Sequence, residues 1–328
     1  MKLQDKQIFE IVKGAVTKEK CEGLLCFNRL PKEIVNYYAS FEGERHIRAT
    51  STSGVRLDFI SDTEWIKITY RLFKASSQPR GAFDIWVNGE LYTSVGDNLD
   101  DGSERSIETV FEKGEKHITV YLPCLSRASV SSMEISDGAF ITPAEDKPLA
   151  LFFGDSITQG YTSSFPSLTY VSRVAEHFGW DFYNFGIGGD IYNSEIPTVT
   201  VDRTPEIVFT SYGTNDWSTG MSAGALKKNM REYYNILCEK YPTSRLVAIL
   251  PIWRDCFADN RGDVRTIGKF DELFPFMRDI LREFPRVEII DGRELVPHAN
   301  GMFADAYLHP NETGYEFYAT RLCAKMSK

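Results

Sequence analysis

The pattern of apolar and polar positions changes near residue 145. Before that point, apolar residues alternate with polar residues in short runs, and turn residues such as Asn88-Gly89 separate the runs. Strict alternation indicates half-buried strands, and Asn-Gly between two such runs predicts a hairpin. The runs lie at 55–59, 66–72, 83–87, 118–122 and 130–135. Because helical periodicity is nearly absent here, we expect residues 1–145 to form an all-β sandwich or jelly roll.

The rest of the chain alternates apolar strands with amphipathic helices. The pattern predicts strands at 149–153, 182–185, 207–211, 246–251 and 287–290, and helices at 166–178, 223–240, 269–283 and 312–326. This alternation is typical of a parallel sheet that helices cover on both faces. The polar stretch 142–148 carries two prolines and is the expected linker. We therefore predict a second, α/β domain over residues 146–328.

One strand of this second domain stops abruptly at Gly154-Asp155-Ser156. Ligands bind at the carboxyl ends of strands in an open parallel sheet, so Ser156 would face the crevice where a substrate binds. Its backbone N–H would also point toward the substrate and could stabilise an anion. A purely structural interpretation is a strand-end turn that caps a helix. This motif alone leaves both interpretations open.

Four separated motifs together resemble the site blocks of the SGNH, or GDSL, hydrolase superfamily. They are Gly154-Asp155-Ser156, the stretch 184–190 (Asn-Phe-Gly-Ile-Gly-Gly-Asp), Gly213-Thr214-Asn215-Asp216 and His309-Pro310-Asn311. Each motif is weak alone, but the four occur in the family's order, and the resemblance covers about residues 148–328. The resemblance implies a three-layer α/β/α, flavodoxin-like catalytic domain and a carboxylic ester hydrolase.

The resemblance also implies a role for each matched residue. Ser156 corresponds to the nucleophile and His309 to the general base, while the backbone N–H groups of Ser156 and Gly189 and the Asn215 side chain correspond to the oxyanion hole. The chemistry is consistent, because serine needs a neighbour to take its proton and histidine titrates near neutral pH. His298 lies in a loop near the same end of the sheet and is the one rival to His309.

The chain departs from the family pattern before the histidine. The family usually has an aspartate three residues earlier, where this chain has Ala306, whereas Asp305 lies four residues before His309. An extra loop residue could still bring Asp305 to the imidazole and complete a triad. The alternatives are a dyad in which a backbone carbonyl orients His309, or an aspartate from another strand end, Asp291 or Asp255.

Several further residues near strand ends have both a functional and a structural interpretation. Trp217 and Trp253 could line an acyl or sugar pocket or could belong to the core or its rim. Arg254 could bind an acidic substrate or form a surface salt bridge. The motif aspartates are expected to hold the loops through hydrogen bonds to backbone N–H groups; they are Asp155, Asp190 and Asp216.

Composition and charge exclude several classes of partner. The net charge of −9 argues against nucleic acid as a main partner, because phosphate binding needs a basic face. No apolar run is long enough to cross a membrane and the N-terminus does not resemble a signal peptide, so we expect a cytoplasmic protein. The six scattered cysteines include no Cys-x-x-Cys, which predicts reduced thiols and no metal site. The resemblance implies no cofactor.

The predicted two-domain architecture favours one group of functions within the superfamily. Some two-domain members of the superfamily, including carbohydrate esterases that deacetylate sugars, carry a jelly-roll domain before the catalytic domain, and residues 114–123 look like part of one. We therefore expect a serine esterase that removes a small acyl group, most simply acetyl, from a small-molecule or oligosaccharide ester through an acyl-enzyme. The alternatives are a lipase, thioesterase or acyltransferase with the same site, or a non-catalytic carbohydrate-binding protein. The sequence does not specify the oligomeric state.

Overall fold

The chain forms two compact units in the computed structural model, which describes residues 1–258 and 262–327. The first unit comprises residues 1–147, 164–167 and 181–183, and the second comprises residues 148–163, 168–180 and 184–328. The boundary near residue 147 lies close to the predicted linker. The division into two domains, residues 1–145 and 146–328, stays a prediction.

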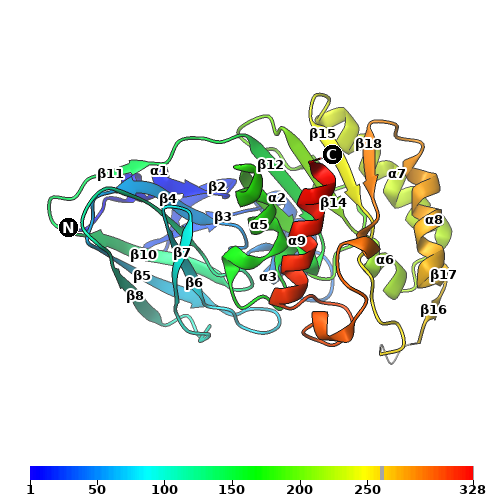
Figure 1. The fold of residues 1–328 in the computed structure, drawn as a ribbon, viewed down its shortest axis with the longest axis horizontal. Helices are drawn as coiled ribbons and strands as arrows, with labels where there is room; N and C mark the ends of the chain where they lie inside the picture. Colours follow the sequence, from blue (N-terminus) through cyan, green and yellow to red (C-terminus); the bar gives the residue numbers. More distant parts are fainter. Residues whose placement is uncertain (259–261, 328) are drawn as a thin grey trace. The chain divides into compact units, whose positions relative to one another are not determined.

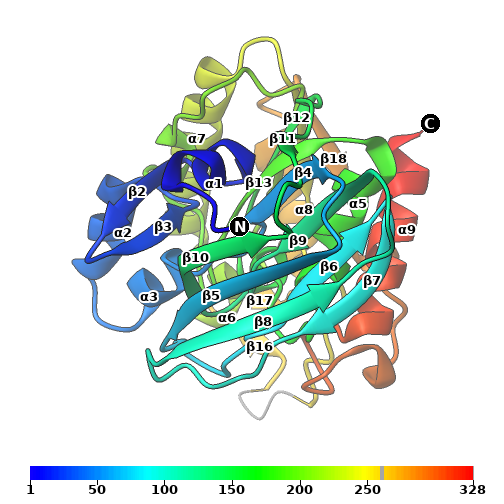
Figure 2. The same cartoon turned by 90° about the vertical axis from the view of Figure 1, so that its left-hand side faces the viewer.

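The first unit is built on two antiparallel sheets (Figure 2). One sheet has the order β1 (Val12–Lys13), β4 (Arg56–Ser61), β9 (Lys116–Tyr121), β6 (Phe83–Val87), β7 (Glu90–Val95), with β11 (Ile141–Pro143) paired to β4. The other has the order β2 (Thr17–Cys21), β3 (Leu24–Asn28), β10 (Arg127–Ile135), β5 (Trp65–Phe73), β8 (Glu104–Val110). Apolar side chains of both sheets form one buried cluster, which includes Leu57, Phe59, Ile68 and Val130.

The alternating runs of the sequence form the strands that they predict. Burial alternates along most of β5, and Asn88 and Gly89 adopt positive φ angles of 51° and 83° in the turn between β6 and β7. These angles suit a type I′ turn, whose twist matches that of the flanking strands. In β10 the register shifts between Val130 and Ser132. This bulge explains why the apolar positions of β10 do not keep one period.

The first fifty residues contain elements that the sequence did not predict. Three short helices occur there: α1 (Asp5–Ile11), α2 (Lys32–Ala39) and α3 (Arg45–Ala49). The helices α1 and α2 bury two residues each, and α3 buries only Ala49. The sequence of these helices therefore shows little apolar periodicity. The linker prediction was also wrong in part, because Thr142 and Pro143 pair with β4 as part of β11.

The second unit is built on a sheet with the order β13 (Asp181–Gly186), β12 (Leu149–Gly154), β14 (Ile207–Ser211), β15 (Arg245–Ile249), β18 (Val287–Ile290). Counted along the unit, this is the 2-1-3-4-5 order of flavodoxin-like folds. Helices α5 (Tyr170–Phe178) and α9 (Glu312–Met326) lie on one side, and α7 (Ala223–Lys240) and α8 (Phe270–Leu281) on the other (Figure 1). The expected fold class is confirmed.

The register of the parallel strands places the predicted motifs at one edge of the sheet. Gly154 pairs with Ser211, and Ser211 pairs with Ile249. The segments that follow these residues therefore leave the sheet side by side. They contain the short helices α4 (Ser156–Gln159) and α6 (Thr214–Ser218) and the hairpin of β16 (Val264–Arg265) and β17 (Gly268–Lys269). The 3₁₀ turns are η1 (Pro166–Leu168), η2 (Ile196–Thr198), η3 (Gly292–Glu294) and η4 (Asn300–Met302).

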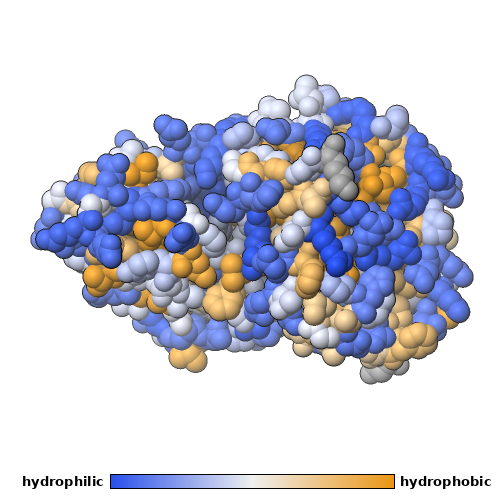
Figure 3. Space-filling model, viewed as in Figure 1, coloured by the Kyte–Doolittle hydropathy of each residue, from blue (hydrophilic) through white to orange (hydrophobic). Residues whose placement is uncertain are grey.

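The described helices and one face of the surface bear on what a membrane span requires. None of the described helices is both long enough and apolar enough to cross a bilayer. On the face drawn in Figure 3, apolar residues are dispersed among hydrophilic ones. No disulfide joins the cysteines, all of which lie in the described ranges.

Candidate active site

Ser156 stands at a sharp turn from a buried strand into a short helix. It is the first residue of α4, and the Asp155 carboxylate caps this helix by accepting the Ile157 N–H at 2.9 Å. The turn requires glycine at 154, because a Cβ there would lie 2.1 Å from the Thr158 Oγ1 atom. The first N–H groups of a helix have no partner within the helix. The Ser156 N–H is thus available to a ligand.

A continuous chain of hydrogen bonds joins Ser156, His309 and Asp305. The Ser156 Oγ lies 2.9 Å from His309 Nε2, and His309 Nδ1 lies 2.6 Å from Asp305 Oδ2. These distances are within hydrogen-bond reach of a serine nucleophile, its general base and an orienting carboxylate. The three side chains that the sequence predicted to act together are thus in contact.

The loop before His309 accommodates the extra residue through one left-handed position. Ala306 has a φ of 66°, which is uncommon for a residue other than glycine. The Asp305 Oδ1 atom accepts backbone N–H groups at 2.8 to 3.1 Å from three residues, Tyr307, Leu308 and His309. The loop therefore folds around the Asp305 carboxylate, whose other oxygen faces the imidazole.

Asp305 remains ionised in this environment. Burial opposes its charge, but the hydrogen bonds from the His309 ring and from the Leu308 N–H outweigh burial and hold the pKa of Asp305 well below its usual value. An ionised partner is what a histidine needs to stay in the tautomer that accepts the serine proton.

The alternative residues from the sequence are engaged elsewhere. The His298 ring stacks on Trp253 at 5.2 Å between centroids, and its Nε2 atom lies 2.8 Å from the Arg293 carbonyl oxygen. Asp291 accepts hydrogen bonds from the Arg278 and Arg293 guanidinium groups. Asp255 accepts a hydrogen bond from Asn300 at 2.7 Å. The geometry therefore favours His309 and Asp305 over these rivals.

Gly189 and Asn215 have features that suit oxyanion donors. Gly189 has a φ of 77°, a conformation that glycine adopts readily. The Asn215 amide donates one N–H to the Asp190 carbonyl oxygen at 3.0 Å, which fixes the amide and leaves its second N–H for a ligand. Among the described residues, the backbone N–H groups of Ser156 and Gly189 have no hydrogen-bond partner. That these three donors converge on one oxyanion stays a prediction.

Residues 152–317, slightly more than half of the chain, match the model of the GDSL-like Lipase/Acylhydrolase family. The chain belongs to this family. The family inferred from the four motifs is confirmed, and the chain is an ester hydrolase. No curated protein sequence matches it.

Solved structures share the fold of this GDSL-like acylhydrolase over most of its length. A salicylyl-acyltransferase, SsfX3, from a tetracycline biosynthetic pathway is 22% identical, with a TM-score of 0.80 over 96% of this chain and 93% of its own. A protein from Bacteroides ovatus ATCC 8483 described as a GDSL-like lipase is 17% identical, with a TM-score of 0.80 over 100% and 97%. A family two carbohydrate esterase from Clostridium thermocellum, in complex with cellohexaose, is 14% identical, with a TM-score of 0.67 over 84% and 93%. At these identities the similarity shows the fold.

Two tyrosines contact the segments that carry His309 and Ser156 in this acylhydrolase, and the sequence did not predict them. The Tyr161 ring contacts the His309 ring edge to face, with 4.5 Å between centroids. The Tyr315 hydroxyl donates to the carbonyl oxygens of Ile157 and Tyr161, so that α9 supports the segment after Ser156. Both tyrosines are close in sequence to a motif, but nothing in the sequence shows which nearby aromatic residue faces the imidazole.

Of the three residues that the sequence suggested for a pocket, one lies in the core and two line a cavity. Trp217 is fully buried and its indole N–H donates to the Gly268 carbonyl oxygen, which supports the structural interpretation. Trp253 and Arg254 line a cavity of about 280 Å³. Arg254 is buried rather than on the surface, and its guanidinium donates to Thr214 Oγ1 at 3.1 Å. No cluster of three possible metal ligands occurs in residues 1–258 and 262–327.

The motif aspartates are buried behind the site of the acylhydrolase. The Asp216 Oδ1 atom accepts the Tyr192 N–H at 3.1 Å, whereas its Oδ2 atom is buried without a partner. Burial, with smaller contributions from the nearby Asp190 and Asp155 carboxyl groups, raises the pKa of Asp216 to about 7 despite the hydrogen bond from the Tyr192 N–H. Burial likewise raises the pKa of Asp155 to about 7. Asp155 and Asp216 thus accept the expected hydrogen bonds from backbone N–H groups.

The raised pKa of Asp216 predicts a pH-dependent stability. Between its ordinary value of 3.8 and about 7, the folded protein retains a proton that the unfolded chain releases, so the free energy of unfolding falls as the pH rises through this window. Asp216→Asn removes that dependence. We expect the Tm of the variant, relative to the wild type, to be higher at about pH 8 than at about pH 5.

Thermal unfolding of both proteins at the two pH values measures this difference. Asp279→Asn is the matched control, because the Asp279 side chain is 70% exposed. The Tm difference between this variant and the wild type should be the same at both pH values. A Tm difference for Asp216→Asn that does not depend on pH would show that Asp216 is ionised in the folded protein.

Proposed function

We propose that this chain is a serine esterase that releases a small acyl group, acetyl in the simplest case, from a carbohydrate ester. The alcohol part of the substrate is a small molecule or an oligosaccharide. Ser156 attacks the ester carbonyl while His309 takes its proton, and the alcohol leaves with that proton. Water then hydrolyses the acyl-enzyme through the same histidine. The N–H groups of Ser156 and Gly189 and the Asn215 amide bind the negative oxygen in both steps.

The hydrogen-bond chain from Ser156 through His309 to Asp305 is the observation that supports this proposal most strongly. An imidazole within 2.9 Å of the serine Oγ can remove its proton without rearrangement. A carbohydrate-binding protein without catalytic function would have no need for this arrangement. Family membership and the fold shared with a carbohydrate esterase that binds cellohexaose also support the proposal.

The acyl group and the acceptor can be determined with a series of esters. We expect kcat/KM to fall from p-nitrophenyl acetate to butyrate to octanoate, and we expect acetate release from acetylated xylo-oligosaccharide. A preference for octanoate would contradict a small acyl group and favour a lipase or thioesterase. Faster acyl transfer to an added alcohol than to water would favour an acyltransferase, the activity of one protein with this fold.

A further inference from the structure

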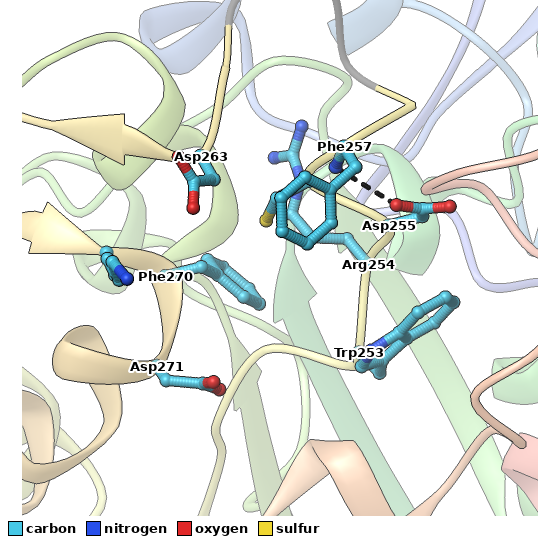
Figure 4. Close-up of a pocket in the computed structure, with 9 residues that line it drawn as sticks. Trp253, Arg254, Asp255, Phe257, Asp263, Phe270 and Asp271 are labelled. Carbon is cyan, nitrogen blue, oxygen red and sulfur yellow. Dashed lines mark hydrogen bonds between the residues drawn. The ribbon is translucent and has the colours of Figure 1, made fainter.

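We propose that the cavity beside the catalytic loop binds a sugar ring of the substrate's alcohol part. The cavity has a volume of about 280 Å³, and Trp253, Arg254, Phe257, Asp263, Lys269 and Phe270 are among the residues that line it (Figure 4). This inference rests on the proposed esterase function and names the part of the site that recognises the alcohol.

The cavity lies at the same sheet edge as the nucleophile. Trp253 follows Ile249, whose strand is two positions from the strand that ends before Ser156. Neighbouring strands are about 5 Å apart, so the strand that leads to Trp253 lies about 10 Å from the strand that leads to Ser156. The cavity therefore lies on the side of the sheet edge where the alcohol part of an ester held at Ser156 would extend.

Two cavity residues are in direct contact with segments that carry the proposed catalytic groups. The Asp255 N–H donates to the Tyr307 carbonyl oxygen at 2.9 Å, in the loop that holds Asp305 and His309. The Arg254 guanidinium donates to Thr214 Oγ1, next to Asn215. The cavity wall is therefore continuous with both sides of the proposed active site.

Aromatic rings surround the cavity and leave surface for a ligand. The Phe257 residue is 89% exposed, which is unusual for a large apolar side chain. Trp253 is held by stacking on His298, with 13° between the ring planes. Figure 4 shows the rings of Phe257, Phe270 and Trp253 among the side chains that line the cavity. Flat aromatic faces of this kind pack against the C–H face of a pyranose ring.

The polar lining suits hydroxyl groups better than a charge or a lipid tail. Asp263 and Lys269 line the cavity, and among the described residues neither side chain has a hydrogen-bond or ion-pair partner. A carboxylate accepts and an ammonium group donates hydrogen bonds, so together they satisfy sugar hydroxyls. The volume is just below the range of about 300–1,000 Å³ of small-molecule pockets, which fits one ring rather than a long chain.

The test compares a sugar ester with an ester that lacks the sugar. For Phe257→Ala and Asp263→Asn, we expect kcat/KM on acetylated xylo-oligosaccharide to fall about fivefold to tenfold, mainly through KM. Turnover of p-nitrophenyl acetate should stay within about twofold, because its alcohol does not need the sugar contacts. Val264→Ala is the matched control, since Val264 is 58% exposed on the same hairpin and does not line the cavity.

Binding without turnover gives a second, independent measurement. Calorimetric titration of the Ser156→Ala protein with xylotetraose should show weaker binding when Phe257→Ala is added. Unchanged sugar-ester kinetics and unchanged xylotetraose binding in both cavity variants, or equal losses on both esters, would overturn the sugar site and leave the esterase intact. Absence of Ser156-dependent turnover on every ester would instead overturn the proposed function.

Discussion

Ser156→Ala should lower kcat about 10⁶-fold on p-nitrophenyl acetate, the loss seen when a serine hydrolase loses its nucleophile. The remaining rate should exceed that in water, because the oxyanion donors still bind the substrate. Ser156 is only 7% exposed, and its Oγ makes a hydrogen bond to His309, so alanine removes the attacking oxygen with little change in packing. Steady-state kinetics on purified protein with an unchanged Tm measures the effect.

Ser218→Ala is the matched control for this experiment. Ser218 lies on α6 at the same sheet edge and has no place in the proposed mechanism. We expect its kcat to stay within about twofold of the wild type. A Ser156→Ala protein that retains more than about a hundredth of wild-type kcat would contradict a nucleophilic role for this serine.

Asp305→Asn should lower kcat about 10⁴-fold, because an amide favours the wrong imidazole tautomer and cannot stabilise the imidazolium. The amide oxygen can still accept the three loop N–H groups that Asp305 Oδ1 accepts now. The fold of the loop and the Tm should therefore change little, while the rate falls. Kinetics and thermal unfolding of the same preparation separate the two effects.

Asp305→Ala provides the comparison for that variant. It removes both the charge and the acceptor for the loop, so we expect the Tm to fall as well as kcat. If Asp305→Asn retained kcat within about tenfold of the wild type, a Ser156–His309 dyad would be the correct description, with Asp305 serving only to fold the loop.

The strands and the motifs of the candidate site could be predicted because their signals are local. The alternation in β5 and the continuous burial of β12 are visible directly in the sequence. The Ser156 and His309 motifs each place a residue at a strand or helix end, where parallel topology brings strand ends together. Family order then identified which histidine faces the serine.

The contact between Asp305 and His309 could not be predicted with certainty from the sequence. Whether Asp305 reaches His309 depends on the φ of Ala306 and on hydrogen bonds that close the loop around one carboxylate oxygen. Alanine rarely adopts a positive φ, so local propensity argues against the conformation that the structure contains. The loop's own backbone N–H groups stabilise it, and their positions follow only from the folded chain.

Burial of polar residues was the other property that the sequence did not reveal. Arg254 was expected in a surface salt bridge if not at the site, yet it is 2% exposed. Its guanidinium lies 5.2 Å from the Trp217 ring centroid and 5.7 Å from that of Tyr307. These contacts join residues that are far apart in the chain, so the local pattern of apolar and polar positions does not predict them.

Covalent labelling of the serine tests the central claim most directly. The wild-type protein would be treated with a small fluorophosphonate, digested and analysed by mass spectrometry, beside Ser156→Ala. The account predicts one adduct, on the peptide that contains Ser156, loss of esterase activity in proportion to labelling, and no adduct in Ser156→Ala. Labelling at another serine, or full activity in a protein labelled at Ser156, would contradict the account.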